Sequence, residues 1–70
     1  TRYKEELSFL ILEAKYMQAE KSVESKMEDR YRDTVDEYYT FVKEFPESEH
    51  RKDADRFFKK AQRFLEKKNN

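Results

Sequence analysis

The residues that could do chemistry are few in this sequence, and their spacing does not assemble a catalytic set. His50 is the only histidine, and it lies two residues after Ser48, where a helix is expected to start. A general base needs partners within hydrogen-bond reach, and only Glu47 and Glu49 lie close in sequence. We therefore expect His50 to be an ordinary surface residue near a helix start.

Carboxylates are abundant, but their placement favours solvated helix faces over a site. Adjacent acidic residues on a helix point about 100° apart, so they do not converge on one substrate atom. Such pairs occur at 5–6, 28–29 and 36–37. No Glu-x-x-His motif, which di-metal helical bundles use, accompanies the acidic residues. We expect no catalytic residue, no metal and no cofactor, and instead i,i+4 ion pairs such as Glu28–Arg32 and Asp55–Lys59.

Composition limits the fold class to helices. The 70 residues are 36% hydrophobic and 46% charged with a net charge of zero, and they include no glycine, no cysteine and one proline. Hairpin-rich β architecture needs many tight turns, and a disulfide or cysteine-based metal site needs cysteine. The longest apolar run, 9–12, is far shorter than the roughly 20 residues that cross a bilayer. Residues 1–50 carry a net charge of −5 and residues 51–70 a net charge of +5.

Apolar periodicity predicts three antiparallel helices, at about 3–21, 26–45 and 49–67. Pro46 cannot continue a helix, and Ser48 can cap the next one. Ser25 with Glu28 matches a capping box at the start of the second helix. The predicted inward positions of the second and third helices are Met27, Tyr31, Thr34, Val35, Tyr38, Phe41, Val42, Phe45, Ala54, Phe57, Phe58, Ala61, Phe64 and Leu65.

The first helix carries two apolar stripes, although a helix exposed on one side needs only one. One stripe holds Leu7, Leu10, Ile11, Ala14 and Met17, and the other holds Phe9, Leu12, Tyr16 and Ala19. Two further helices cannot cover both. We therefore expect Phe9, Leu12 and Tyr16 to contact a partner, either a second copy in a symmetric dimer or more of the same protein.

Other partner contacts are expected on the second and third helices. Tyr39 points away from the apolar stripe of its helix, so it is either exposed or contacts a partner, as tyrosine often does at interfaces. Arg56, Lys60 and Arg63 belong to the basic third helix, which could dock an acidic partner. The alternative is nucleic acid, for which clustered lysine and arginine are the usual footprint.

The same segments resemble a known family. The resemblance is carried by Leu7 to Tyr16 with 19–23, Arg30-Tyr31, Val35, 36–39 with Phe41, Phe45-Pro46-Glu47-Ser48 and Ala54. These segments are similar to the C-terminal tetratricopeptide-like repeats of BamD-type (YfiO) outer-membrane assembly lipoproteins of Bacteroides-like bacteria. The glycine of a standard repeat is missing, and only Tyr38 of the Thr34/Tyr38/Phe41 set matches well. The resemblance implies a scaffold on the periplasmic face of the outer membrane, which helps to insert β-barrel proteins. It also implies that this chain is the C-terminal part of a longer protein with an N-terminal lipid anchor.

The sequence thus predicts an all-α, tetratricopeptide-like module over residues 1–70 that holds other proteins and is not an enzyme. Small-molecule substrates are not expected. A regulatory or nucleic-acid-binding helical domain is the alternative, as is a small independent bundle that pairs with itself through its first helix.

Overall fold

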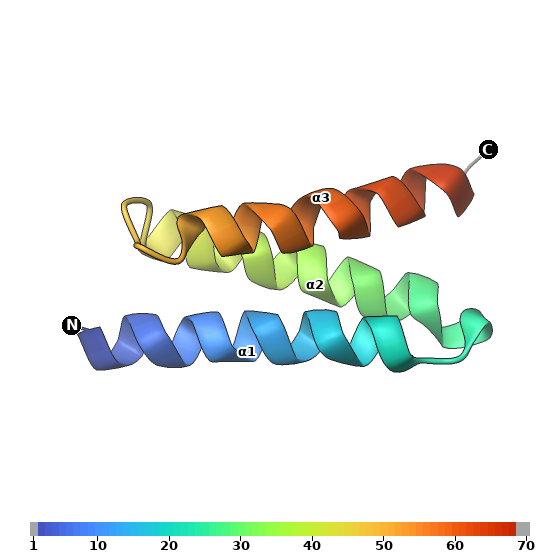
Figure 1. The fold of residues 1–70 in the computed structure, drawn as a ribbon, viewed down its shortest axis with the longest axis horizontal. Coiled ribbons are helices and arrows are strands. Elements are labelled where there is room, and N and C mark those ends of the chain that lie inside the picture. The colour runs from blue at the N-terminus through green and yellow to red at the C-terminus, as the bar shows by residue number, and fades with distance from the viewer. Residues whose placement is uncertain (1, 69–70) are drawn as a thin grey trace.

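Three helices form the whole architecture of the computed structural model, which describes residues 2–68. They are α1 (Arg2–Lys21), α2 (Glu24–Glu44) and α3 (Arg51–Lys68), and no strand occurs in that range. Consecutive helices run antiparallel, so α3 lies along the same direction as α1 (Figure 1). The all-α prediction is confirmed, with helix ends within two residues of those expected. No helix in the described range is long and apolar enough to cross a membrane.

The turn between α1 and α2 differs from the predicted capping box. Val23, in an extended conformation, is the N-cap residue of α2, and no side chain caps the helix. The backbone N–H groups of Lys26 and Met27 both bond to the Val23 carbonyl, so Ser25 is already inside the first helical turn. A helical serine cannot adopt the extended backbone that a capping residue requires. The Ser25/Glu28 prediction is therefore wrong. At the end of α1, the Ser22 hydroxyl donates to the Gln18 carbonyl at 2.6 Å.

The second turn follows the predicted stop and start. Phe45, directly before Pro46, leaves the helical region at φ −130° and ψ 65° and is the C-cap of α2, as expected for a residue that precedes proline. The Ser48 hydroxyl oxygen accepts the His50 backbone N–H at 3.0 Å, and the Arg51 N–H bonds to the Ser48 carbonyl at 3.1 Å. Ser48 therefore closes the turn that leads into α3 and does not cap the helix itself, which begins at Arg51 instead of Glu49.

The core consists mostly of aromatic rings between the three helices. Its ten buried apolar residues are Phe9, Leu12, Tyr16, Ala19, Tyr31, Tyr38, Phe41, Ala54, Phe57 and Ala61. Thr34 is also fully buried, and its hydroxyl donates to the Arg30 carbonyl. Half-buried side chains pack around this cluster: Met27, Val35, Val42, Phe45, Phe58, Phe64 and Leu65. The predicted inward residues of α2 and α3 are all buried or half-buried, which confirms these faces. Val42, which packs at the edge of the core, belongs to the half-buried group.

The small residues of α3 allow close contact with both other helices. Ala54 and Ala61 are fully buried and flank the larger Phe57. The Phe57 ring packs against Phe9 and Tyr16 of α1, with centroid distances of 6.0 and 4.5 Å. On the other side of α3, Phe58 stacks on Tyr38 of α2 at 4.3 Å. One helix therefore holds α1 and α2 together through neighbouring phenylalanines.

Candidate protein-interaction groove

One surface hollow lies where α1, α2 and α3 meet, beside the C-terminal half of α3. Its volume is about 240 Å³, and its lining comes from all three helices: Glu20, Tyr31, Lys60, Arg63, Phe64 and Lys67. A second hollow of about 460 Å³ is lined by Thr40, Lys43 and Glu44 of α2. That lining has no aromatic side chain. We therefore take the first hollow, named here the basic groove, as the candidate site.

Two aromatic rings give the basic groove its apolar floor. Tyr31 of α2 is buried, and the half-buried Phe64 of α3 lies against it with ring centroids 4.8 Å apart. The Tyr31 ring also packs at a tilt against the Tyr16 ring, with ring centroids 6.4 Å apart. The floor is therefore a fixed part of the core, since each ring is held by the next.

The rim of the basic groove is positively charged on the α3 side. Lys60, Arg63 and Lys67 are spaced by three and four residues, which places them on one face of the helix. Opposite them stands Glu20 of α1, whose carboxylate is 4.0 Å from the Lys60 ammonium. Both partners of this pair are exposed, so the pair contributes little to stability. Three cations facing one carboxylate leave a surplus of positive charge at the rim.

Glu20 also orders the interior behind the groove. The Tyr16 hydroxyl donates to Glu20 Oε2 at 2.9 Å. Burial and this acidic neighbour raise the pKa of Tyr16 to about 12, and burial with Glu20 also raises the pKa of Tyr31. Both phenols are therefore neutral over the physiological range, and Glu20 is held as an acceptor facing the groove.

Of the basic residues predicted to contact a partner, the structure brings two into this groove. Lys60 and Arg63 belong to the rim, and Lys67, which was not on the predicted list, joins them. Arg56 lies one turn before Lys60, and its guanidinium pairs with Asp53 at 2.9 Å. The helical spacing of Lys60, Arg63 and Lys67 in the sequence would have been enough to include Lys67.

The remaining predicted contacts are elsewhere in the fold. Tyr39 of α2 is 55% exposed. Its ring makes edge-to-face contacts with Tyr38 and with Phe58 of α3, with ring centroids 5.5 Å apart in both pairs. Phe9, Leu12 and Tyr16 are buried inside the three helices, so the prediction that they form an exposed partner surface is wrong. The physical reason is that their stripe supplies the rings that stack on Phe57 and pack at a tilt against Tyr31 and Phe41.

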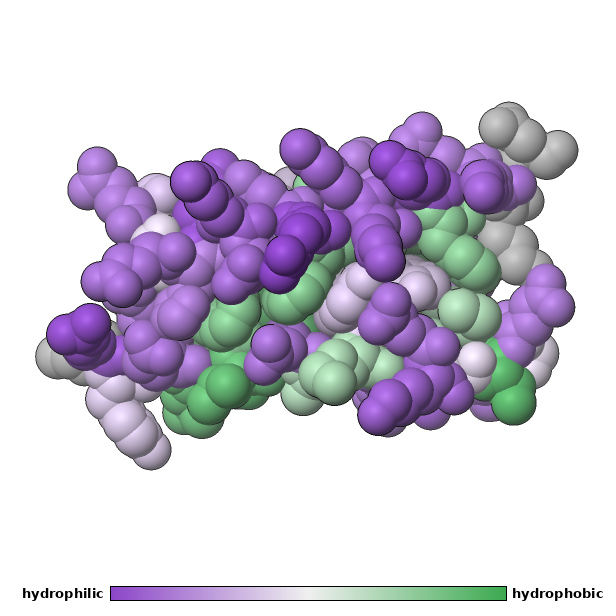
Figure 2. Space-filling model, viewed as in Figure 1, coloured by the Kyte–Doolittle hydropathy of each residue, from purple (hydrophilic) through white to green (hydrophobic). Residues whose placement is uncertain are grey.

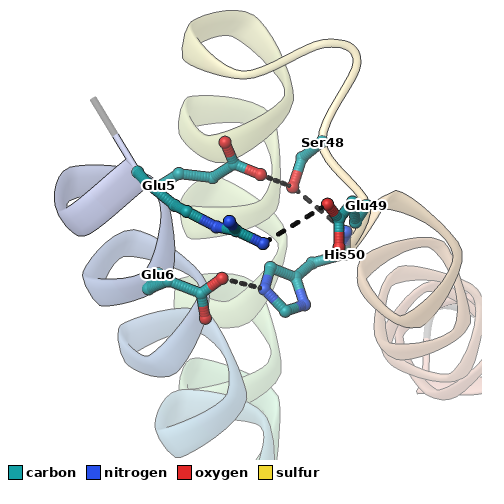
Figure 3. Close-up of polar contacts among 6 residues, drawn as sticks. Glu5, Glu6, Ser48, Glu49 and His50 are labelled. Carbon is teal, nitrogen blue, oxygen red and sulfur yellow. Dashed lines mark hydrogen bonds and ion pairs between the residues drawn. The ribbon is translucent and has the colours of Figure 1, made fainter.

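A polar cluster joins the N-terminal end of α1 to the turn before α3 (Figure 3). The Ser48 hydroxyl donates to Glu5 at 2.5 Å, and the His50 ring contacts Glu6 through Nε2 at 2.8 Å. The His50 ring also stacks on Phe9, with centroids 4.2 Å apart. His50 is thus half-buried in a contact between distant segments, and the expectation of an ordinary surface histidine is wrong. We name Glu5, Glu6, Ser48 and His50 the α1–turn cluster.

The α1–turn cluster contains serine, histidine and carboxylates, but their connections are those of a structural contact. A nucleophilic serine needs the histidine ring within hydrogen-bond reach of its hydroxyl. Within residues 2–68, the imidazole bonds to Glu6 and the hydroxyl to Glu5, and the two groups do not bond to each other. The outermost contact, Arg2 with Glu49 at 3.6 Å, is fully open to water. The same part of the chain contains no group of side chains suited to hold a metal ion.

Of the two predicted i,i+4 ion pairs, one is present and one is replaced. Glu28 pairs with Arg32 at 2.9 Å. Asp55 pairs with Arg51, one turn earlier, at 3.2 Å, instead of with Lys59. Arg51 is the better partner because its planar guanidinium also reaches the Pro46 carbonyl, at 3.0 Å.

No protein-family model matches this chain, and no curated protein or solved structure is significantly similar to it.

Proposed function

We propose that this chain is a non-enzymatic protein-interaction module and that its basic groove docks a segment of another protein. The observation that carries the proposal is the combination of a preformed aromatic floor, Tyr31 and Phe64, with the cations of Lys60, Arg63 and Lys67 on one rim. Sites of this kind bind an apolar side chain on the floor and orient its neighbours by charge. The segment that fits has a leucine or aromatic residue next to acidic residues.

The arrangement of helices supports a tetratricopeptide-like interpretation. An antiparallel pair, α1 and α2, is followed by a third helix that lies along α1, which is how stacked helical hairpins continue from one repeat to the next. The expected role is a scaffold of the BamD type on the periplasmic face of the outer membrane, with other assembly proteins as partners. The family resemblance of Phe45-Pro46-Glu47-Ser48 supports this role, together with the bond that the Ser48 oxygen accepts from the His50 N–H.

Nucleic acid is the alternative ligand for the same basic row. Glu20 does not separate the two ligands, because its carboxylate, 4.0 Å from Lys60, would repel acidic side chains as well as phosphates. The floor rings do separate them, since they pack into the core, whereas single-strand binders offer exposed rings on which bases stack. A protein segment is therefore the better fit.

The test is a binding titration followed by NMR of the isotope-labelled chain. The probe is an acetylated and amidated octapeptide of leucine, aspartate and glutamate, compared with the same peptide carrying lysines for the acids. We expect shifts at Tyr31, Arg63 and Phe64 with the acidic peptide only. Arg63→Glu should abolish them, whereas Lys52→Glu, the same charge change on an exposed site three turns away, should not.

Two results would contradict the proposal. One is equal shifts with the lysine peptide. The other is tighter binding of a single-stranded oligonucleotide with a steep dependence on salt, which is the signature of phosphate contacts. The cellular role is tested separately by fractionation. The protein should sediment with the outer membrane, and recovery with the cytosol would exclude the BamD-like assignment.

A further inference from the structure

The outer face of α1 is the largest apolar surface that the described chain leaves uncovered. Five of the seven large hydrophobic side chains that are exposed belong to α1, with exposed fractions of 76% for Tyr3, 46% for Leu7, 54% for Leu10, 42% for Ile11 and 46% for Met17. Ala14, which lies between them, is exposed as well. Figure 2 shows green patches of hydrophobic residues along the lower edge of the molecule, where Figure 1 places α1. We name Tyr3, Leu7, Leu10, Ala14 and Met17, with Ile11 at its edge, the outer stripe.

The spacing of the outer stripe is that of a helix-pairing seam. Tyr3, Leu7, Leu10, Ala14, Met17 and Lys21 follow one another by four, three, four, three and four residues. Apolar residues at this spacing form the contact line of a two-helix coiled coil. The seam lies opposite the buried stripe of Phe9, Leu12, Tyr16 and Ala19, so the core does not compete for it.

A second copy of this chain is the occupant that the surface chemistry favours. Within residues 2–68, the other exposed large hydrophobics are single residues, Val23 in the first turn and Tyr39 on α2. The α3 helix exposes a polar outer face. The one surface of this chain that matches the outer stripe is therefore the outer stripe itself, which implies an isologous, two-fold contact.

We propose that two copies associate through the outer stripe with their α1 helices antiparallel. Pairing about residue 12 sets Leu10 against the partner's Ala14 and Leu7 against the partner's Met17. It also sets Tyr3 against the partner's Lys21, a cation above an aromatic ring. A parallel pair would set alanine against alanine, which leaves a void, and Lys21 against the partner's Lys21, which repels.

The charges beside the stripe permit the antiparallel arrangement. Glu6, Glu13 and Glu20 line one flank and would face the same flank of the partner. The Glu6 carboxylate contacts the His50 ring nitrogen of its own chain at 2.8 Å, and the Glu20 carboxylate lies 4.0 Å from the Lys60 ammonium of its own chain. Glu13 alone then meets its own copy near the two-fold axis, which costs affinity but leaves the apolar seam intact.

The contact is small, so association is weak and reversible. Standard interfaces bury about 800 Å² on each partner, and one stripe on a 20-residue helix about 30 Å long offers less. Sedimentation equilibrium from about 10 µM to 1 mM covers the range of dissociation constants expected for such an interface. The apparent mass should rise from 8.7 kDa toward twice that value as concentration increases.

Two exposed positions give a matched pair of variants. Leu10→Lys places a charge in the centre of the seam on both copies and should weaken association roughly tenfold or more. Val23→Lys makes the same kind of change at an exposed site outside the seam and should leave association unchanged. Far-UV circular dichroism of each variant checks that the helices are intact. A chain that stays monomeric at 1 mM, or equal association of the two variants, overturns the proposal.

Orientation has its own measurement, because the sequence has no cysteine and one can be introduced at a chosen site. Spin labels on Lys21→Cys should lie roughly 25–30 Å apart in the antiparallel dimer, from a rise of 1.5 Å per residue over 18 residues. A parallel dimer would hold them about 10 Å apart, and that result overturns the antiparallel arrangement. Glu13→Gln should tighten the antiparallel dimer about twofold by removing the like charge at its centre.

Discussion

The Tyr38 hydroxyl donates a hydrogen bond to Asp55 at 2.5 Å and thereby joins the middle of α2 to the first turns of α3. The same carboxylate oxygen accepts the Arg51 guanidinium at 3.2 Å. The hydrogen bonds from Tyr38 and Arg51 lower the pKa of Asp55, while burial and the bond to Asp55 raise the pKa of Tyr38. The fold therefore stabilises the neutral phenol and the ionised carboxylate together.

Replacing this hydroxyl should weaken the chain and move the acid titration. Tyr38→Phe removes a hydrogen bond to a charged acceptor, so we expect a loss of about 1–2 kcal/mol in the free energy of unfolding at pH 7. Because the folded-state pKa of Asp55 is depressed below 3.8, the ionised carboxylate stabilises the folded protein above pH 3.8, and this stabilisation is lost as pH falls further. The difference in unfolding free energy between wild type and variant should therefore become smaller in acid. Urea unfolding from pH 7 to pH 2 measures it, and Tyr39→Phe, the same change on the exposed neighbour, should have little effect.

Alkaline pH should destabilise the protein as its buried tyrosines titrate. The pKa of Tyr16 rises from 10.0 to about 12 on folding, so the folded state binds more protons than the unfolded state between these values. The stabilisation is complete below pH 10 and is lost as pH approaches 12. Urea unfolding monitored by far-UV circular dichroism should show the unfolding free energy falling from pH 10 to pH 12. In Tyr16→Phe the unfolding free energy should fall less over the same range. An unfolding free energy independent of pH from 10 to 12 would contradict the prediction.

Phe57 is a buried side chain that joins α3 to α1, so its removal should be damaging. It is 9% exposed and contacts Phe9 and Tyr16 of α1. Phe57→Ala should lower the free energy of unfolding by about 3–5 kcal/mol, because it removes apolar contact and leaves a cavity. Tyr3→Ala, an aromatic-to-alanine change at a 76% exposed site, should cost less than 1 kcal/mol. Urea denaturation at low micromolar concentration compares them, and a Phe57→Ala loss below 1 kcal/mol would mean that Phe57 is not a core residue.

Ser48 should contribute more to stability than an ordinary turn serine because its side chain makes two contacts. Its oxygen accepts the His50 N–H, and its hydroxyl donates to Glu5. Ser48→Ala should cost about 1–2 kcal/mol and should release the start of α1. Amide hydrogen exchange measures this, with faster exchange expected at residues 6–9 and unchanged exchange at 34–41. Ser25→Ala is the matched control, since Ser25 caps nothing, and equal effects of the two substitutions would contradict the assignment.

Local patterns in the sequence predicted most of the fold. Apolar steps of three and four residues located all three helices, and Pro46 with Ser48 located the break between α2 and α3. The start of α2 was misplaced because Ser25 and Glu28 have the right spacing for a capping box, whereas Val23 is the N-cap residue. That choice depends on how the hairpin closes, and single-residue preferences do not contain it.

The candidate site was harder to predict because its residues are paired across helices. The two stripes of α1 are similar in apolarity, and the deciding factor was the stacking of Phe9 and Tyr16 on Phe57. His50 meets Phe9 and Glu6 more than forty residues away in sequence. Neither relationship leaves a local signal, whereas the basic row of α3 does, which is why Lys60 and Arg63 were identified in advance.

The aromatic core gives this protein an internal optical signal of its tertiary packing. Six of its ten buried apolar residues are aromatic, and three of these are tyrosines. The sequence contains no tryptophan, so near-ultraviolet circular dichroism arises from tyrosine and phenylalanine, most of which lie in the interior. Loss of that signal while the far-ultraviolet helical signal persists would reveal a state with formed helices and fluid packing. The native chain can thus report, without any added label, whether its helices are packed or only formed.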